Sequence, residues 1–590
     1  MLAGRAALVA VAALLACGDA AEAEAPALAE DYRPARTWHE EGSSKPREAQ
    51  SPYPAVRSCP ATLEAPEQLN RTISQGCGVV RVRAGYRLEG GSLTLEPGVT
   101  LAFEPDAGLV LGTGEKARLV IAGTAEAPVL LTAAEGSAPG SWPGIWLYPG
   151  AEGSRIEHAV IERAGHVERS AVHVEAAKVI IEHTRLRAIA GLAVHVSGDG
   201  SLERFDHNAV EDYRAPVVML MPPDSAAAIG PDNELPAGAT VNLLRGFVRE
   251  SGRWRDIGAP FVVDDLIDVA GHEGAPAVLS IDPGVELRFG SVGYINVGYY
   301  KPGEIRAEGT ADAPVRFTSA TTREPGAWKG VRLYRHARGV FRHAIFEYGA
   351  QDAGRGVLFA NSEASLTVES CQFTANKSGV RLLGSTLTIP SFAGNRFEDT
   401  PQPVNLTPQI LGGLAGDNDY GGQRVIVNEG RITRDTRWRA SAGADYELRG
   451  TVSILGATLE IEAGAQLVVR DGFRIDVGER RMGPPASLQL RGAPGRPITF
   501  TGLSDKRGSW DSIVIHPYAR GSVLEHVALS NAGGEAAVEV LAGGEATVKD
   551  LSCARCYSPA LTWACEAQVT HARVEALDGT PAGAEAPRCE

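Results

Sequence analysis

Short apolar stretches separated by turn-forming residues dominate the chain between about residues 78 and 550. The stretches are about four to six residues long, are rich in Val, Ile, Leu and Phe, and are separated by Gly, Asn, Asp and Pro. This pattern is typical of strands and turns, and no segment shows a long run of helical apolar spacing. Asn-Gly hairpin signals are scarce and the stretches resemble one another, which favours coils stacked in parallel over an antiparallel sandwich. We therefore predict an all-β solenoid.

Three segments of the chain align with one another along almost their whole length. The first contains LEPGVTL at residues 95–101, the second IDPGVEL at 281–287 and the third IEAGAQL at 461–467, so the shared glycine recurs after 186 and then 180 residues. Further landmarks keep the same order and register. They are the proline-led strands at 128–132, 314–318 and 497–501, the Trp-containing turns at 140–145, 326–331 and 508–513, and the His-containing strands at 156–160, 341–345 and 524–528.

This self-similarity predicts three tandem units of about 180 residues, at residues 58–230, 231–415 and 416–590. The repeated signature is a strand ending in Pro-Gly-Val, a Gly-Thr-x-x-x-Pro-Val strand and then Gly-x-Trp-x-Gly-Ile. It resembles that of the bacterial right-handed parallel β-helix repeat proteins of the pectin-lyase-like superfamily. The resemblance covers roughly residues 78–550 and implies a right-handed parallel β-helix.

The predicted coil stacking limits what the three units do together. The resemblance implies about seven to ten coils per unit, and neighbouring strands in a sheet lie about 4.8 Å apart, so equivalent positions in adjacent units are separated by roughly 35 to 50 Å. His158, His343 and His526 recur once per unit and therefore cannot share a metal ion. Each of these histidines lies two residues after an apolar residue inside a predicted strand, and we expect it in an inward or turn stack with a satisfied hydrogen bond.

Residues 1–17 have the features of an export signal. Arg5 precedes an apolar run at residues 6–16, which is shorter than the roughly 20 residues that a membrane-spanning helix needs. The sequence LLAC at residues 14–17 resembles the lipobox of bacterial lipoproteins, and an ordinary secretory peptide is the alternative. The resemblance implies cleavage before Cys17 and acylation of that cysteine, which makes a stable membrane anchor because several acyl chains insert together.

The residues after Cys17 suggest where the anchor is held. Gly18 stands where lipoproteins of the inner membrane tend to carry aspartate, so the resemblance favours the outer membrane or the cell surface. Residues 18–57 are rich in Ala, Glu and Pro and contain few large apolar side chains. We predict that they form a disordered acidic spacer, which tethers the folded part to the membrane.

The composition agrees with a folded β protein and argues against one class of partner. Hydrophobic residues make up 44% of the chain and aromatic residues 6%, while 68 glycines and 36 prolines supply turns. The formal net charge is −15, and it becomes −16 once residues 1–16 are removed with Arg5. No Lys/Arg-rich patch interrupts the acidic balance, so nucleic acid is not expected as a partner.

Trp142, Trp328 and Trp510 recur in Gly-flanked turns and are candidate ligand-binding residues. An exposed indole face on a long groove is one way to hold a sugar ring. The alternative is that each indole closes a coil by packing on the turn, which a motif repeated once per unit favours.

Asp264 and Asp265, close to Asp268, are the acidic ligand-binding candidates. Glycan cleavage needs either two carboxylates that flank the bond or a base supported by a bound cation. Asp445 occupies the position of Asp265 in the next unit, which favours a structural role. The Asn-Thr-Asp strand and Gly-His-Gly turn expected of polygalacturonases or pectate lyases are missing, and GHEG at residues 271–274 matches them only in part. We therefore assign no catalytic residue, and the sequence leans away from an enzyme.

Residues 416–422 (GDNDYGG) form an acidic, Gly-rich turn of the kind that offers oxygen ligands to calcium. Asn428 stands where a calcium loop carries its bidentate glutamate, and residues 232–234 (DNE) occupy the corresponding place one unit earlier. A turn that joins two units is therefore the preferred interpretation. We therefore predict no cofactor, with calcium at this turn as the alternative.

The cysteines agree with export to an oxidising compartment. Cys59 and Cys77 flank the start of the predicted β-helix and are candidates for a disulfide that caps it. Cys371 is expected inside the core. Four further disulfide candidates lie at the C-terminal end, with three pairings open: Cys553, Cys556, Cys565 and Cys589. A zinc site is the alternative for the Cys-x-x-Cys pair among them.

Three functions of different classes agree with these observations. The preferred one is a non-catalytic cell-envelope lipoprotein that binds a glycan or another surface polymer, with a polysaccharide or a surface protein as its partner besides the membrane. The second is a polysaccharide lyase or glycoside hydrolase of the pectin-lyase-like fold, and the third is a structural stalk or protein-interaction scaffold. A binding surface predicts outward aromatic or polar residues in a row. An enzyme predicts an acidic and basic cluster in one unit only.

Overall fold

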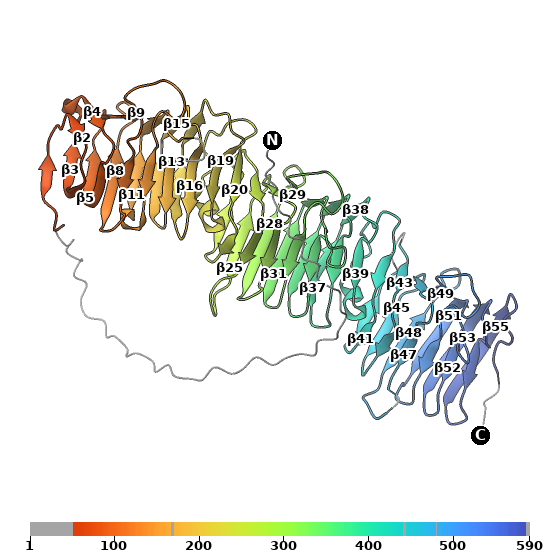
Figure 1. Ribbon diagram of the computed structural model, residues 1–590. Helices are drawn as coiled ribbons and strands as arrows, with labels where there is room; N and C mark the ends of the chain where they lie inside the picture. Colours follow the sequence, from red (N-terminus) through yellow and green to blue (C-terminus); the bar gives the residue numbers. More distant parts are fainter. Residues whose placement is uncertain (1–50, 167–169, 441–443, 480, 586–590) are drawn as a thin grey trace, which may run out of the picture. The chain divides into compact units, whose positions relative to one another are not determined.

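Short strands joined by tight turns build the folded part of the protein (Figure 1). The computed structural model describes residues 51–166, 170–440, 444–479 and 481–585. A typical corner joins β11 (Ser154–Glu157) to β12 (Ala159–Glu162) through a single residue, His158. His158 has a φ of 48°, a left-handed conformation that histidine adopts more readily than most residues. Such one-residue corners turn the chain sharply from one sheet into the next.

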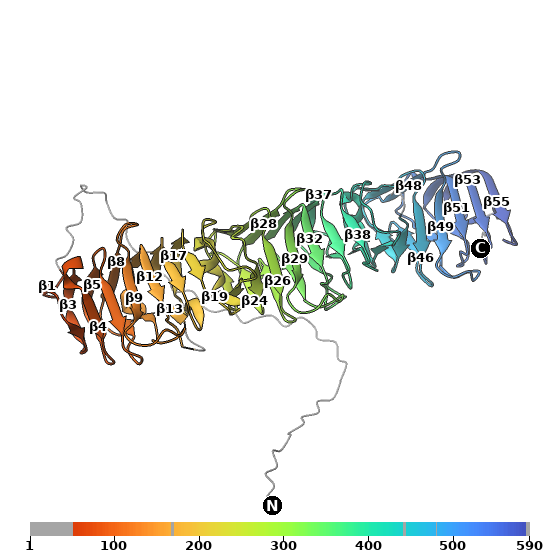
Figure 2. The ribbon, with the colours of Figure 1, turned by 90° about the horizontal axis from the view of Figure 1, so that it is seen from above.

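The strands pair in parallel and form five sheets (Figure 2). The first strand of a 19-stranded sheet is β1 (Ala55–Arg57) and its last is β38 (Arg396–Glu398). The first strand of a 17-stranded sheet is β21 (Gly246–Val248) and its last is β55 (Gln568–Leu577). Along the chain, strands of the other sheets alternate with these. The three shorter sheets have seven, six and six strands.

The seven-stranded sheet contains β2 (Thr62–Leu63), β4 (Val79–Val82), β6 (Thr100–Phe103), β9 (Val129–Ala133), β12, β15 (Arg185–Arg187) and β18 (Ala209–Glu211). The first six-stranded sheet contains β22 (Gly252–Trp254), β25 (Ala277–Ile281), β28 (Gly303–Glu308), β31 (Ala337–Arg342), β34 (Ser365–Glu369) and β37 (Thr388–Ala393). The second contains β41 (Gly430–Ile432), β44 (Val452–Ile454), β47 (Ile475–Val477), β50 (Ile513–Ile515), β52 (Val538–Val540) and β54 (Leu561–Trp563).

Alternate residues of each strand enter one continuous core. In β27 (Tyr294–Val297), Ile295 and Val297 are fully buried, so the side chains between them point away from the core. Aromatic rings in the middle of the chain stack from coil to coil, with centroids 4.7 to 6.3 Å apart. This column contains Phe289, Phe317, Phe346, Phe373, Phe397 and Tyr420. Because one column spans many coils, neighbouring coils stabilise one another.

Buried asparagines at one corner satisfy backbone groups between coils. The Oδ1 atom of Asn395 accepts the backbone N–H of Cys371 at 3.0 Å, and Asn418 accepts the backbone N–H of Asn395 at 3.0 Å. Asn208 and Asn233 form the same arrangement earlier in the chain. Buried polar groups need such partners, so these asparagines hold consecutive corners together. Cys371 is buried, as the sequence predicts.

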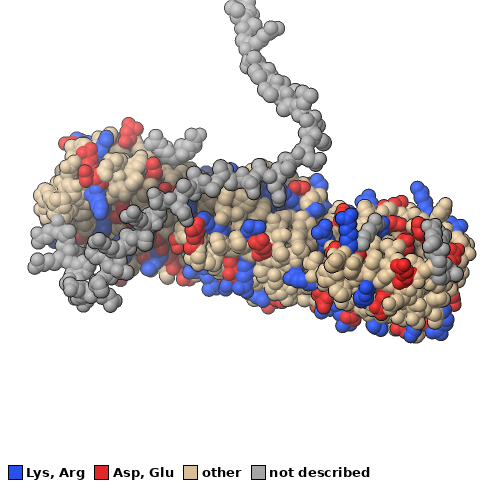
Figure 3. All heavy atoms as spheres, turned by 90° about the horizontal axis from the view of Figure 1, so that it is seen from below, with Lys and Arg blue, Asp and Glu red and all other residues tan. Residues whose placement is uncertain are grey.

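Outward charged side chains pair within and between coils. Arg187 lies 2.6 Å from Glu162 on the preceding coil, and Arg316 lies 2.8 Å from Glu347 on the following one. Acidic and basic side chains lie interspersed on the face drawn in Figure 3. Interspersed charges of both signs favour solubility.

Two of the 3-10 helices, η3 and η4, interrupt the coils. The helix η3 (Pro223–Ala228) lies between β19 (Val217–Met221) and β20 (Thr240–Leu243), and η4 (Pro408–Gly413) follows β39 (Val404–Leu406). The seven-stranded sheet ends with β18 before η3, and the first six-stranded sheet ends with β37 before η4. Both interruptions lie close to the predicted unit boundaries, although the division into three units stays a prediction.

After each interruption, the strands of the next segment belong to a different ladder of paired strands than their equivalents in the preceding segment. The ladder that contains β10 (Ile145–Leu147), the strand after the first repeated tryptophan, continues into β29 (Val315–Ser319), the proline-led strand of the next segment. The ladder of β30 (Gly330–Leu333) reaches the proline-led β49 (Ile498–Gly502) in the same way. Equivalent residues of the three segments therefore lie on different faces, and a ligand along one face cannot meet all of them.

These observations confirm the all-β parallel solenoid. The strand β1 pairs with β3 (Glu67–Ile73), so the folded part begins before residue 58, where the sequence places the end of the spacer. Cys17, the predicted signal peptide and the spacer up to residue 50 lie outside the described residues. Within the described residues, no helix is long and apolar enough to cross a membrane.

A disulfide between Cys59 and Cys77 closes a loop of 18 residues around β3. A closed loop of this length removes conformational entropy from the unfolded chain and so raises its free energy by about 3 kcal/mol. We expect the double variant Cys59→Ser/Cys77→Ser to lower the free energy of unfolding of the N-terminal coils by about 2–4 kcal/mol, measured by urea unfolding with circular dichroism. An unchanged urea midpoint would show that the disulfide does not stabilise this end.

Candidate functional site

The three recurring tryptophans are core residues, which corrects their assignment as ligand-binding candidates. Trp142, Trp328 and Trp510 are all 0% exposed. Each indole N–H donates to a main-chain carbonyl at 2.7 or 2.8 Å. Trp142 stacks on Phe103 with centroids 3.9 Å apart, and Trp328 stacks on Phe289 at 4.2 Å. Because the indoles are buried, they offer no face to a sugar ring.

Asp264 and Asp265 are held within the turn between β23 (Phe261–Val263) and β24 (Leu266–Val269). The Oδ1 atom of Asp265 accepts the backbone N–H of Leu266 at 2.7 Å. Asp264 accepts a hydrogen bond from Asn242 at 3.4 Å. These contacts support the structural interpretation, since the two carboxylates order a turn.

The outer face of the 17-stranded sheet carries a row of polar and aromatic side chains instead. The row follows one register position through β24, β27, β30, β33 (Leu358–Ala360) and β36 (Val380–Leu382). Its members are Asp268, Asn296, Arg332, Phe359 and Arg381. Burial raises the pKa of Asp268, which favours its uncharged form. The row faces away from the core, although Asp268, Asn296 and Phe359 are only 4%, 6% and 8% exposed.

An exposed aromatic surface borders this row. It consists of Tyr299, Tyr300 and Tyr334, with Phe359 beside them. Tyr299 and Tyr300 are 51% and 68% exposed, in a turn that begins with Gly298 at a φ of 70°. The ring of Tyr299 lies edge-on to Tyr300 at 4.5 Å and to Tyr334 at 4.8 Å. Mutual packing orders the tyrosines while part of each ring stays open to solvent.

Cations lie next to the aromatic surface. The Nη1 atom of Arg355 donates to the hydroxyl of Tyr334 at 3.2 Å. Lys329 and Arg332 both lie 4.7 Å from the ring centre of Tyr294. Within the described residues, the buried Nε atoms of Arg332 and Arg381 have no hydrogen-bond partner. Burial lowers the pKa of the Arg381 guanidinium, which shows that its charge is poorly compensated.

The Gly-rich turn at residues 416–422 uses its oxygens within the protein. Asp417 accepts the backbone N–H of Gly394 at 3.1 Å, and Asp419 accepts that of Gly421 at 2.9 Å. The carbonyl oxygen of the Asn418 side chain belongs to the asparagine ladder. These bonds favour the interpretation as a joining turn over a calcium site.

A second cluster of charged side chains lies on the outer face of β47, β50 and β52. His516 is buried, and its Nε2 atom lies 2.8 Å from the Asp476 carboxylate. Arg474 also contacts Asp476 at 3.1 Å and lies 3.5 Å from Asp511. Burial alone would raise the pKa of Asp476, but the hydrogen bond with His516 and the charge of Arg474 outweigh it and lower the pKa.

Glu539 on β52 has the opposite electrostatic environment. Burial and the nearby Glu535 and Asp511 carboxylates raise its pKa. Asp476 pairs with Val514, which pairs with Glu539, so the two acids are two rungs apart on one face. Two rungs correspond to about 10 Å between backbones. The aligned positions of the preceding segment hold Asn296 for Asp476 and Tyr334 for His516, so the cluster departs from the repeat.

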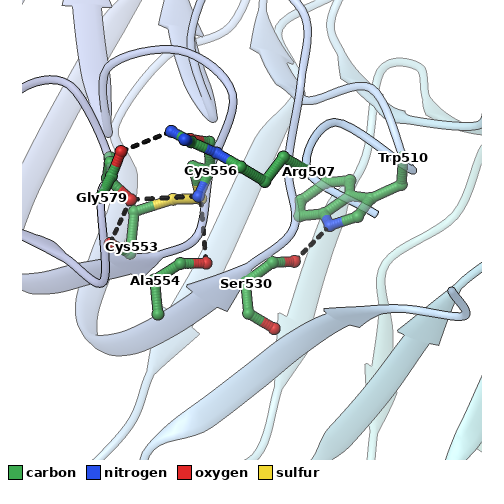
Figure 4. The surroundings of a disulfide bond; sticks show 8 residues. Arg507, Trp510, Ser530, Cys553, Ala554, Cys556 and Gly579 are labelled. Carbon is green, nitrogen blue, oxygen red and sulfur yellow. Dashed lines mark hydrogen bonds between the residues drawn. A yellow bond between two sulfur atoms is a disulfide. The ribbon is translucent and has the colours of Figure 1, made fainter. Parts of the chain in front are cut away.

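Cys553 and Cys556 form a disulfide at the C-terminal end (Figure 4). Arg507 donates to the carbonyl of Cys556 at 2.8 Å and also to that of Gly579. Because both sulfurs are bonded to each other, this pair presents no thiolate to zinc. Cys565 is disulfide-bonded as well, and Cys589 lies outside the described residues.

No protein-family model and no curated protein matches this chain. The structure therefore defines the class, a parallel β-solenoid, without placing the chain in a family. This architecture is compatible with carbohydrate binding and with carbohydrate cleavage, so surface residues must decide between them.

Sequence reasoning did not identify the tyrosines or the Asp476 cluster. Adjacent tyrosines at 299 and 300 appear in one segment only, since the aligned turns read GTGEK at residues 112–116 and GERRM at 478–482. Departure from the repeat was the usable signal at both places. The tryptophans drew attention because they obey the repeat, which is what core residues do.

Proposed function

We propose that this protein is an exported, lipid-anchored surface protein that binds a polysaccharide carrying carboxylate groups. The observation that supports the proposal best is the exposed aromatic surface of Tyr299, Tyr300 and Tyr334. Exposed, mutually packed tyrosines offer flat apolar faces to the C–H groups of sugar rings at a low entropic cost.

The neighbouring cations support an acidic polymer. A guanidinium pairs with a carboxylate through two parallel hydrogen bonds, and Arg332 and Arg381 are partly exposed on the outer face of the sheet. A uronic-acid polymer would supply both the ring faces and the carboxylates. The acidic net charge of the whole chain does not oppose this, because screening confines a surface charge to about 10 Å in salt.

Binding should depend on the exposed tyrosines. We expect the purified protein to bind polygalacturonate or alginate in calorimetry and affinity electrophoresis, and to bind neutral dextran more weakly. Tyr299→Ala/Tyr300→Ala should weaken binding by about tenfold or more, because each ring contributes about 0.5–1.5 kcal/mol.

Tyr557→Ala is the matched control, since Tyr557 is also 68% exposed but lies outside the aromatic surface. Equal loss in both variants would contradict the assigned site. Failure to bind any polysaccharide would favour the scaffold hypothesis.

The Asp476 cluster favours a glycoside hydrolase as the alternative function. Neighbouring carboxylates with pKa values shifted in opposite directions are what acid and base catalysis require. Their backbone spacing of about 10 Å lies just beyond the roughly 6.5–9.5 Å between the carboxyl groups of inverting enzymes, a difference that side-chain rotation can close. In this hypothesis Glu539 is the general acid and Asp476 is the base, which His516 and Arg474 keep ionised.

The two functions differ in whether new reducing ends appear. For a binding protein we expect depletion of acidic polysaccharide from solution without new ends. New ends that Glu539→Gln reduces by at least about a thousandfold, while Glu535→Gln retains them, would establish the hydrolase instead.

A further inference from the structure

Three histidines form a column on consecutive coils, away from the aromatic surface. His158, His183 and His207 directly follow β11, β14 (Lys178–Glu182) and β17 (Ser201–Asp206) and occupy the first corner position after each strand, with φ of 48°, 51° and 54°. The rings of His158 and His183 stack with centroids 4.5 Å apart, and those of His183 and His207 lie 4.7 Å apart. The column therefore orients the ring of His207, the last of the three.

Two carboxylates approach the end of this column. The Oδ2 atom of Asp206 lies 3.5 Å from the Nδ1 atom of His207. Asp232, which comes from the next coil, brings a third ligand atom, and all three atoms lie within 4.8 Å of one another. The Oδ1 atom of Asp206 is buried and has no hydrogen-bond partner among the described residues. This oxygen is thus not consumed by the protein's own hydrogen bonds.

A groove of about 530 Å³ gives access to the same place. His183, His207, Asp232 and Glu234 line it, and these side chains are exposed. A hydrated ion can therefore reach the ligand atoms, and Glu234 or a water molecule can occupy a remaining coordination position.

We propose that Asp206, His207 and Asp232 bind a divalent transition-metal ion of the Zn²⁺ class. Imidazole together with carboxylate suits such ions, whereas calcium prefers oxygen ligands alone. Zinc bonds to nitrogen and oxygen are about 2.0–2.2 Å long, so the ligand atoms of a tetrahedral site lie about 3.4 Å apart. The 3.5 Å separation of Asp206 and His207 already matches this value. Asp232 is exposed and free to rotate into place.

The next joining turn supplies a matched control within the same chain. Asn418 accepts the backbone N–H of Asn395 just as Asn233 accepts that of Asn208, so Asp417 corresponds to Asp232. There, Ala393 and Gly394 stand in place of Asp206 and His207. The equivalent corner therefore has one carboxylate and no imidazole.

Calorimetry tests the proposal. The purified full chain, without a histidine tag, is titrated with ZnCl₂. We expect a saturable binding event that Asp232→Asn weakens by at least about tenfold and Asp417→Asn leaves unchanged. His207→Gly should have the same effect as Asp232→Asn, and it should not harm folding because glycine accepts the left-handed corner. ZnCl₂ should raise the melting temperature of the wild type and not that of Asp232→Asn.

Absence of saturable binding in the wild type would overturn the site. Equal affinity in the wild type and Asp232→Asn would overturn it too, as would an equal loss in Asp417→Asn. Metal-free melting temperatures of all variants show whether a loss of binding is instead a loss of folding.

Discussion

Trp142→Ala is expected to lower the free energy of unfolding by about 3–5 kcal/mol and to leave polysaccharide binding unchanged. The indole of Trp142 is fully buried, stacks on Phe103 and donates to the carbonyl of Glu162 at 2.8 Å. Its removal leaves a cavity and an unsatisfied buried carbonyl. Because coils unfold with their neighbours, the earliest transition in urea unfolding followed by circular dichroism reports the loss.

Trp146→Ala is the matched comparison for this variant. Trp146 lies on β10 with its side chain only partly buried, so its removal should cost clearly less stability. If Trp142→Ala instead kept its stability and lost affinity for polygalacturonate, Trp142 would have to be assigned as a ligand-binding residue.

Asn395→Ala is expected to destabilise the protein by about 2–4 kcal/mol, because each orphaned buried polar group costs about 1–3 kcal/mol. The Asn395 side chain accepts the backbone N–H of Cys371 at 3.0 Å and donates to the carbonyl of Val368 at 3.0 Å. It also donates to Asn418 at 2.9 Å. Alanine removes all three bonds and brings no replacement partner into a corner that excludes water.

Asn242→Ala controls for the loss of an asparagine as such. Asn242 is partly exposed, and water can replace its contacts with Thr240 and Asp264. We expect a change within about 0.5 kcal/mol for this variant. Equal melting temperatures for the two variants would show that the asparagine ladder does not hold the corners together.

The candidate surfaces were only partly predictable from the sequence. Tyr299 and Tyr300 are exposed aromatic residues of the kind that the sequence predicts for a binding face, whereas the predicted tryptophans lie inside. A Gly-flanked turn does not reveal on which side of the coil its aromatic ring packs. The ring of Trp142 turns inward because Phe103 of another coil receives it, and that partner is 39 residues away in the chain.

The histidines illustrate the same limit. The sequence places His158, His343 and His526 in separate units and rightly keeps them apart, because they recur at the unit length. The partners of His158 are instead His183 and His207, which recur at the shorter length of one coil. Coil length varies along the chain, so only the folded stack shows which corners fall beside one another.

The sequence alone determined the strand and turn alternation, the parallel stacking and the recurrence of the motifs, because these depend on short-range periodicity and on glycine and proline positions. Only the tertiary structure decided which side chains face solvent and which faces the repeated motifs occupy. At η3 and η4 the chain leaves the regular coil path, and each equivalent strand then pairs in another ladder. Such a shift depends on contacts between coils that are distant in sequence, and local sequence patterns do not reveal these contacts.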